Sequence, residues 1–173
     1  MEFLSFDKLN ISKNYLHNFI NENINNKNII NATNLIDYNL INQLKTFLIQ
    51  KGYNCKNNEY YVEIHNQNNL NYKNKFPLHV DSNGPIPGNV VTFIYYYYFT
   101  PNIEGGNLII QDYHKYKWWF LEYKKYYLKT INVWTEEHKN RFVFMKENLY
   151  HKAENIYSTT DFQRIFLTIF IKI

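Results

Sequence analysis

The chain has 173 residues, which is enough for one domain with a substantial core, and 45% of them are hydrophobic. Its net charge of +4 is a mild excess that permits an acidic partner without requiring one. No apolar run is long enough to span a bilayer, and the N-terminus lacks the pattern of a secretory signal peptide. Cys55 is the single cysteine, so an internal disulfide is excluded. We therefore expect a cytoplasmic protein in a reducing compartment, with no membrane partner.

Residues 1–55 show helical periodicity. A first helix after Ser12, which is suited to cap it, would carry four apolar residues on one face: Tyr15, Leu16, Phe19 and Ile20. A second helix would carry six apolar residues at helical spacing before a stop at Gly52: Ile36, Leu40, Ile41, Leu44, Phe47 and Leu48. We expect these helices to pack on one face of a sheet.

From about residue 59 the apolar period changes to that of strands. Short strands without intervening helices favour a sandwich or a closed jelly roll. We therefore expect one domain, residues 1–173, that is mostly β, with helical support in 1–55 and a jelly-roll catalytic core in 56–173. The predicted strands are residues 60–64, 89–99, 107–111, 141–145, 150–155 and 163–173, with the start of another at 70–72 and a polar loop at 66–69.

A candidate metal site begins in the stretch Phe-Pro-Leu-His-Val-Asp-Ser, residues 76–82. On an extended backbone the side chains of His79 and Asp81 point the same way. His151 supplies a third candidate ligand. Two histidines and one carboxylate leave metal positions open, which suits ferrous iron in enzymes that activate oxygen. The pair alone is weak evidence, since about one chain in six of this composition contains it by chance. The alternative is a histidine hydrogen-bonded to a nearby aspartate.

Arg164 is one of only two arginines and lies in the apolar run 162–171, which is typical of a strand buried on both faces. A buried guanidinium is costly unless an anion meets it, and its planar fork suits a carboxylate. The alternative is an internal salt bridge to Asp or Glu. Alternation places Arg164, Phe166, Thr168 and Phe170 on one face of the strand, and Ile165, Leu167, Ile169 and Ile171 on the other.

Six segments match a known enzyme family in order and spacing: residues 79–81, 91–96, 105–108, 141–144, 151–153 and 164–168. They resemble the iron(II)- and 2-oxoglutarate-dependent dioxygenases, and within them the prolyl-hydroxylase branch. The resemblance spans about a hundred residues, and no single segment is specific. It implies a double-stranded β-helix, or jelly roll, which holds the metal inside one mouth and is braced by N-terminal helices.

The resemblance also implies roles for individual residues. His79, Asp81 and His151 would bind Fe(II), and Arg164 would bind the far carboxylate of 2-oxoglutarate. Four further residues correspond to positions around the cosubstrate in the resembled enzymes: Tyr96, Thr168, Leu108 and Tyr72. Tyr96 would place a phenol on that same carboxylate, and alternation along residues 95–98 puts Tyr96 and Tyr98 on one face of the strand, Tyr95 and Tyr97 on the other.

The activity implied is hydroxylation of a protein or peptide residue such as proline, with O2 consumed and succinate and CO2 released. Ascorbate would keep the iron reduced. An aspartate at position 81 favours hydroxylation over halogenation, because halogenating relatives lack that carboxylate. Two alternatives stay open: a nucleic-acid oxidative demethylase of the same superfamily, and a metal-binding jelly-roll protein without turnover.

Residues 113–134 look like an insertion between two barrel strands, in which lysines and aromatic residues alternate over 115–127. The spacing fits either a helix or a pair of strands. Packing on the barrel is the interpretation we prefer, and peptide or nucleic-acid binding are the alternatives, since such residues stack on bases and contact phosphates. Four histidines have no paired ligand at useful spacing, and we expect ordinary structural roles for them: His17, His65, His114 and His138.

Overall fold

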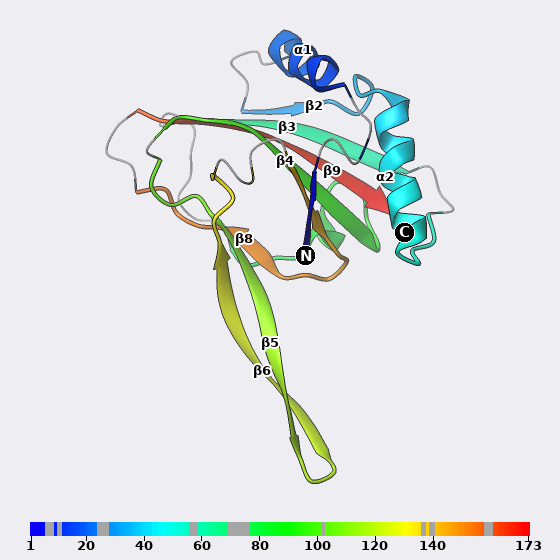
Figure 1. Ribbon diagram of the computed structural model, residues 1–173, viewed down its shortest axis with the longest axis vertical. Coiled ribbons are helices and arrows are strands. Elements are labelled where there is room, and N and C mark those ends of the chain that lie inside the picture. Colours follow the sequence, from blue (N-terminus) through cyan, green and yellow to red (C-terminus); the bar gives the residue numbers. More distant parts are fainter. Residues whose placement is uncertain are drawn as a thin grey trace.

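The structure is a computed structural model, in which antiparallel strands predominate and two α-helices accompany them (Figure 1). It describes residues 1–5, 9, 12–23, 28–55, 59–68, 77–101, 103–135, 138, 141–157 and 161–173. In chain order the helices and strands are β1 (Glu2–Ser5), α1 (Lys13–Asn23), β2 (Ile29–Asn31), α2 (Tyr38–Gln50), β3 (Tyr60–Asn68), β4 (Val90–Phe99), β5 (Leu108–Trp118), β6 (Leu121–Ile131), β7 (Arg141–Met145), β8 (His151–Ala153) and β9 (Gln163–Lys172).

The strands form two sheets. A six-stranded sheet has the order β1-β7-β4-β9-β3-β2, and a three-stranded sheet has the order β6-β5-β8. Helices α1 and α2 pack on one face of the large sheet, and the small sheet lies beyond its other face (Figure 1). The space between the two sheets therefore has strand side chains on both walls.

Both predicted helices are confirmed, and local chemistry explains where they begin and end. The Ser12 hydroxyl accepts the backbone N–H of Tyr15 at the start of α1. The Asp37 carboxylate accepts the backbone N–H of Asn39 at 2.8 Å at the start of α2. Gly52, at φ +86°, follows the end of α2. The short strands β1 and β2 lie in a segment predicted to be helical throughout, and that part of the prediction is wrong.

β9 lies between β4 and β3 at the centre of the large sheet, which explains its nearly continuous apolar sequence. The predicted alternation is confirmed. Ile165, Leu167, Ile169 and Ile171 are buried against the helices in the main core, and each contributes about 1.5–3 kcal/mol of burial free energy. The opposite face of β9 carries Arg164, Phe166, Thr168 and Phe170 into the space between the sheets.

β4 contains an irregularity that the sequence pattern did not predict. The β4–β9 register shifts between Tyr96 and Tyr98, so that Tyr98 lies opposite Ile165 and Phe99 lies opposite Arg164. Tyr96 stays on the site face as predicted. Tyr98 does not share that face, because the extra residue at the bulge reverses the alternation after it.

Two loop and insertion predictions are corrected by the structure. Residues 66–68 belong to β3 rather than to a loop, whereas residues 70–72 lie outside the described part of the chain. Residues 113–131 form strands, with β5 and β6 paired from Leu108↔Ile131 to Trp118↔Leu121. The preferred interpretation that the insertion packs on the barrel is wrong for residues 115–127, because this hairpin extends away from the body (Figure 1).

Candidate metal and carboxylate site

A backbone contact brings the two candidate histidine ligands together. His79 forms an isolated antiparallel bridge with His151 of β8, in which each N–H donates to the other residue's carbonyl, at 3.0 and 2.8 Å. Asp81 follows at the start of a short 3-10 turn, Asp81–Asn83, rather than on a continuing strand. The predicted juxtaposition is therefore present, although a single bridge and a turn produce it instead of a full strand.

The three side chains present their donor atoms to one point. Asp81 Oδ1 lies 3.5 Å from Nε2 of His151 and 3.8 Å from Nε2 of His79. All three potential ligand atoms lie within 4.8 Å of one another. Metal–ligand bonds of about 2.1 Å at angles of 90–110° separate two ligand atoms by about 3.0–3.4 Å. The two separations from Asp81 Oδ1 are slightly longer than this, so the side chains would move inward to coordinate a metal.

Hydrogen bonds to the second ring nitrogens fix the histidine tautomers. Nδ1 of His79 lies 2.9 Å from the Pro77 carbonyl, and Nδ1 of His151 lies 2.9 Å from the Leu149 carbonyl. A carbonyl only accepts, so each Nδ1 carries the proton and each neutral ring leaves Nε2 with its lone pair toward Asp81. Burial also lowers the pKa of His151, more than the Asp81 carboxylate raises it, and this favours the neutral ring.

The orientation of Asp81 is fixed in the same way. Thr92 of β4 donates from Oγ1 to Asp81 Oδ2 at 2.5 Å, which leaves Oδ1 facing the histidines. The distance of 3.5 Å or more between this oxygen and both Nε2 atoms is too long for a good hydrogen bond. The alternative of a histidine simply hydrogen-bonded to the aspartate therefore explains the geometry less well than a ligand set does.

The candidate ligands open into a pocket of about 600 Å³ between the two sheets. This volume is within the usual range for small-molecule sites. Seven of the eight predicted site residues line this pocket: His79, Asp81, His151, Arg164, Tyr96, Thr168 and Leu108. The eighth, Tyr72, lies outside the described residues.

Arg164 is 1% exposed, and neutral groups orient its guanidinium. Its Nε donates to Gln67 Oε1 at 2.6 Å, and its Nη1 donates to the Gly106 carbonyl at 2.8 Å. The rings of Trp134 and Phe166 lie 5.3 and 5.8 Å from its central carbon. A planar cation held in this way within a pocket is suited to bind a carboxylate in a bidentate manner.

Gly106 is required for this arrangement. Its φ is +70°, a conformation that favours glycine, and a Cβ at this position would lie 2.5 Å from Arg164 Nη1. The same residue's carbonyl accepts the indole N–H of Trp134 at 2.7 Å. Gly106 therefore positions both the arginine and the ring beside it.

Two hydroxyl-bearing side chains lie on the same pocket wall as Arg164. Tyr96 is buried, and burial raises the pKa of its phenol well above the usual range, although the nearby Arg164 lowers it in part. The phenol is therefore neutral at physiological pH and can donate a hydrogen bond to an anion. Thr168, also buried, lies opposite Ile94, two residue pairs along the β4–β9 ladder from Tyr96.

Sequence reasoning missed the contribution of β3 to the pocket. Glu63, His65 and Gln67 alternate along this strand and all face the pocket. The His65 ring stacks on Phe166 with centroids 4.5 Å apart, and its Nε2 lies 3.0 Å from Glu63 Oε2. His65 therefore lines the pocket, and its expected ordinary structural role stays a prediction. Alternation beyond residue 64 would have shown these positions, but residues 66–69 were interpreted as a loop.

The other three histidines lie away from the pocket lining and make structural contacts. Nδ1 of His17 lies 2.6 Å from the Tyr97 hydroxyl. The rings of His114 and His138 stack on Tyr127 and Phe3, with centroids 4.6 and 4.1 Å apart.

A scan against protein-family models finds no match for this chain, and a search of the curated proteins finds no significant relative. Among the described residues, neither α-helix combines the length and the hydropathy required to traverse a bilayer.

Proposed function

We propose that this protein is an Fe(II)- and 2-oxoglutarate-dependent dioxygenase of the prolyl-hydroxylase-like branch, with a double-stranded β-helix core. One observation carries the proposal: the His79–Asp81–His151 set and the buried Arg164 line the same pocket. The ligand set alone, or the buried arginine alone, is compatible with many functions. Together they fit a cosubstrate that chelates a metal at one end and presents a carboxylate at the other.

The donor set fits ferrous iron. Two neutral imidazoles and one carboxylate lie close together in the wall of the pocket. This arrangement leaves positions for a cosubstrate and for oxygen. When bound, iron and 2-oxoglutarate would supply the oxidising power to hydroxylate an unactivated C–H bond, with succinate and CO2 as coproducts.

The chain's own residues would hold and orient these groups. Thr92 and the Pro77 and Leu149 carbonyls fix the ligand side chains before a metal arrives. Arg164 would bind the far carboxylate of 2-oxoglutarate, with Tyr96 donating to it. Three further residues would shape the wall around the cosubstrate and exclude water from it: Thr168, Leu108 and Ile94.

A protein or peptide residue such as proline is the proposed substrate, on the strength of the resemblance in residues 91–96 and 141–170. A cytoplasmic location, where Cys55 stays a free thiol, goes with this proposal. Oxidative demethylation of nucleic acid is a second candidate, which the exposed lysines and aromatic residues of 115–127 favour. It predicts binding to single strands that weakens steeply with salt.

The proposal is tested by following 2-oxoglutarate consumption. Purified protein with Fe(II), ascorbate and O2 should convert 2-oxoglutarate to succinate and CO2, slowly without substrate and faster with a peptide that gains one oxygen in mass. Asp81→Ala should abolish conversion, whereas Asp161→Ala, a change of the same type outside the pocket lining, should not. Binding of Fe(II) without any succinate in the presence of oxygen would refute the enzyme and leave a metal-binding jelly roll.

A further inference from the structure

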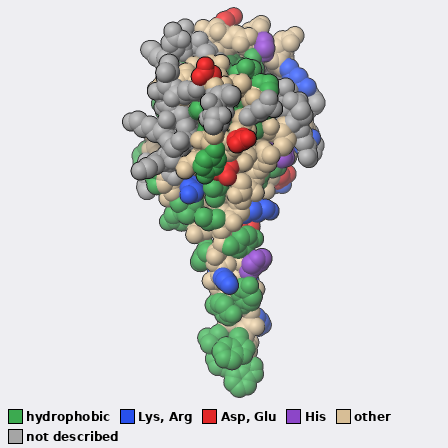
Figure 2. Space-filling model, turned by 90° about the vertical axis from the view of Figure 1, so that its left-hand side faces the viewer, with side chains coloured by type: hydrophobic (Ala, Val, Ile, Leu, Met, Phe, Trp, Pro, Cys, Tyr) green, Lys and Arg blue, Asp and Glu red, His purple; other side chains and the backbone are tan. Residues whose placement is uncertain are grey.

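The β5–β6 hairpin stands apart from the rest of the molecule (Figures 1 and 2). β8 pairs with β5 at Leu108–Ile110, and the Gln111 N–H donates to the Tyr150 carbonyl, so beyond Gln111 the two strands pair with each other alone among the described residues. Isolated two-stranded hairpins are marginally stable in water. None of residues 109–131 appears in the described lining of the metal pocket. The projection therefore needs an explanation other than the core or the pocket.

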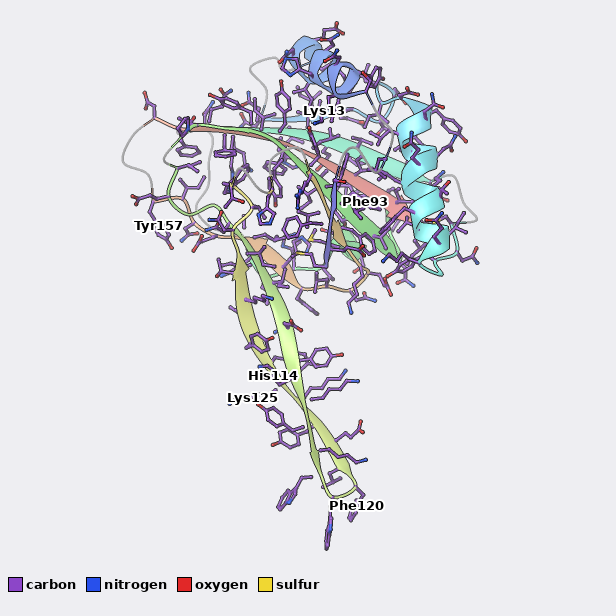
Figure 3. All side chains as sticks on the ribbon, viewed as in Figure 1. Lys13, Phe93, His114, Phe120, Lys125 and Tyr157 are labelled. Carbon is purple, nitrogen blue, oxygen red and sulfur yellow. The ribbon has the colours of Figure 1, made fainter. Side chains whose placement is uncertain are left out.

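The far end of the hairpin is a cluster of large apolar side chains, which we call the tip. Its members are Trp118, Trp119, Phe120 and Leu121, which are 77%, 87%, 81% and 59% exposed. Figure 3 shows Phe120 at the extreme end of the molecule, and Figure 2 shows the apolar side chains gathered there. Exposed apolar clusters of this kind mark interaction sites on otherwise soluble proteins.

The backbone of the tip is strained at Trp119. Trp119 and Phe120 form a two-residue turn, and Trp119 has φ +58°. Glycine or asparagine relaxes such a position, whereas a bulky aromatic residue does not. A tryptophan here sacrifices turn stability for an exposed ring, which points to a function of the tip rather than of the turn.

Lysines surround the hairpin directly behind the tip. Lys115 lies opposite Lys124, and like charges in this register repel each other unless an anion neutralises them. Lys117 adjoins the tip on the same face, and Lys125 lies on the other face, opposite His114. Residues 113–126 contain these four lysines and one acidic residue, Glu122, a net charge of 4 − 1 = +3.

We propose that the tip inserts into the headgroup–acyl boundary of a bilayer that contains anionic lipids. The order along the hairpin matches the order of environments in a membrane surface: apolar residues outermost, then a collar of lysines at headgroup level. Tryptophan favours this interface, and lysine stems extend along apolar surface while the ammonium groups reach the lipid phosphates. Pairing within the hairpin satisfies the backbone groups that face the partner strand, and a position at the hydrated interface rather than in the acyl core leaves water to satisfy those on the outer edges.

Other partners fit the hairpin less well. The rings behind the tip already stack on one another: Tyr116 lies on Tyr123, with centroids 5.2 Å apart and planes 14° apart. This contact covers one face of each ring that a nucleic-acid base would use. A second copy of the chain carries the same net positive charge, so it offers no general complement to the lysine collar.

The hairpin would also set the distance between the membrane and the pocket. Six residues separate Asp112 from Trp118, or about 20 Å of extended strand. The body would therefore stand about that far above the lipid surface, within reach of membrane-associated proteins. The docking proposal depends on the hairpin alone, and its test uses protein without iron, so its failure would leave the proposed enzymatic function untouched.

Flotation of the full-length protein with vesicles tests the proposal directly. Vesicles of phosphatidylcholine with about a third phosphatidylserine should bind at least tenfold more protein than phosphatidylcholine alone, with a decrease at high salt. A Trp118→Ser/Trp119→Ser/Phe120→Ser variant should lose at least tenfold of this binding. The matched control, Tyr38→Ser/Ile49→Ser, changes exposed apolar residues at α2 and should bind normally. Lipids brominated near the headgroup should quench tryptophan emission in the wild type.

Four results would overturn the proposal. One is no binding to anionic vesicles at low salt. Another is equal loss of binding in the tip variant and the control. The third is salt-sensitive binding of an oligo(U) RNA that depends on the two tip tryptophans, without lipid binding. The fourth is self-association that the tip variant abolishes, again without lipid binding. Unchanged circular dichroism of the variants confirms that each remains folded.

Discussion

Gly106→Ala is the substitution that most specifically tests the proposed carboxylate site. A Cβ at this position would lie 2.5 Å from Arg164 Nη1 and 3.1 Å from Ile156 Cγ1. The guanidinium has to move and loses its hydrogen bond to the Gly106 carbonyl. Hydrogen bonds to charged groups contribute about 1.5–3 kcal/mol. If the displaced guanidinium loses a similar free energy in its contact with the cosubstrate carboxylate, 2-oxoglutarate should bind about 10- to 150-fold more weakly. The affinity for Fe(II) should be unchanged.

The backbone strain of the substitution requires its own control. Gly52 has a similar positive φ of +86°, but a Cβ there meets nothing within 4 Å. Gly52→Ala and Gly106→Ala should both lose about 1–2 kcal/mol of stability from the left-handed backbone alone. Only Gly106→Ala should lose cosubstrate affinity, measured by anaerobic optical titration of the Fe(II) protein. Equal 2-oxoglutarate affinity in the two variants would refute the placement of Arg164.

Three further predictions concern the pocket and the core. Thr92→Val removes the donor to Asp81 Oδ2, and its Fe(II) affinity by calorimetry should fall about 10- to 100-fold; an unchanged affinity would contradict the role of this hydrogen bond. Gln67→Leu removes the acceptor for Arg164 Nε, and it should cost about 1–3 kcal/mol in urea unfolding, with weaker 2-oxoglutarate binding; a stable variant with normal binding would contradict it. Burial raises the pKa of Tyr53 to about 12, because the fold favours the neutral phenol. The contribution of Tyr53 to the free energy of unfolding should therefore be complete below pH 10 and decrease from pH 10 to 12. Ultraviolet titration with a Tyr53→Phe control checks the assignment.

The sequence predicted the parts of the fold in which local pattern and packing agree. Arg164 and Thr168 share one face because side chains alternate along the extended residues 163–172. The strand was easy to recognise because it is central and both of its faces are buried. The apolar stripe of α2 was equally clear, because this face of the helix packs on a sheet. Asp37 caps the start of the helix, and Gly52 follows its end.

Other features depend on contacts that no local pattern contains. His79 reaches His151 through one isolated bridge, and Asp81 follows in a turn, so the three side chains lie together as predicted although no continuous strand carries them, and metal binding stays a prediction. The bulge after Tyr96 moves Tyr98 off the site face without any glycine to mark it. The hairpin turn at Trp119 also lacks glycine, and for this reason spacing alone did not separate a helix from a strand pair.

We propose that one pocket holds Fe(II) and 2-oxoglutarate together. An anaerobic optical titration measures this directly: Fe(II) is added to the protein, 2-oxoglutarate follows, and a visible metal-to-ligand charge-transfer band is recorded. We predict a band in the wild type that requires far more 2-oxoglutarate in Arg164→Ala and normal amounts in Arg141→Ala, the matched change at the chain's other arginine. Bound Fe(II) with no band at any 2-oxoglutarate concentration would contradict it.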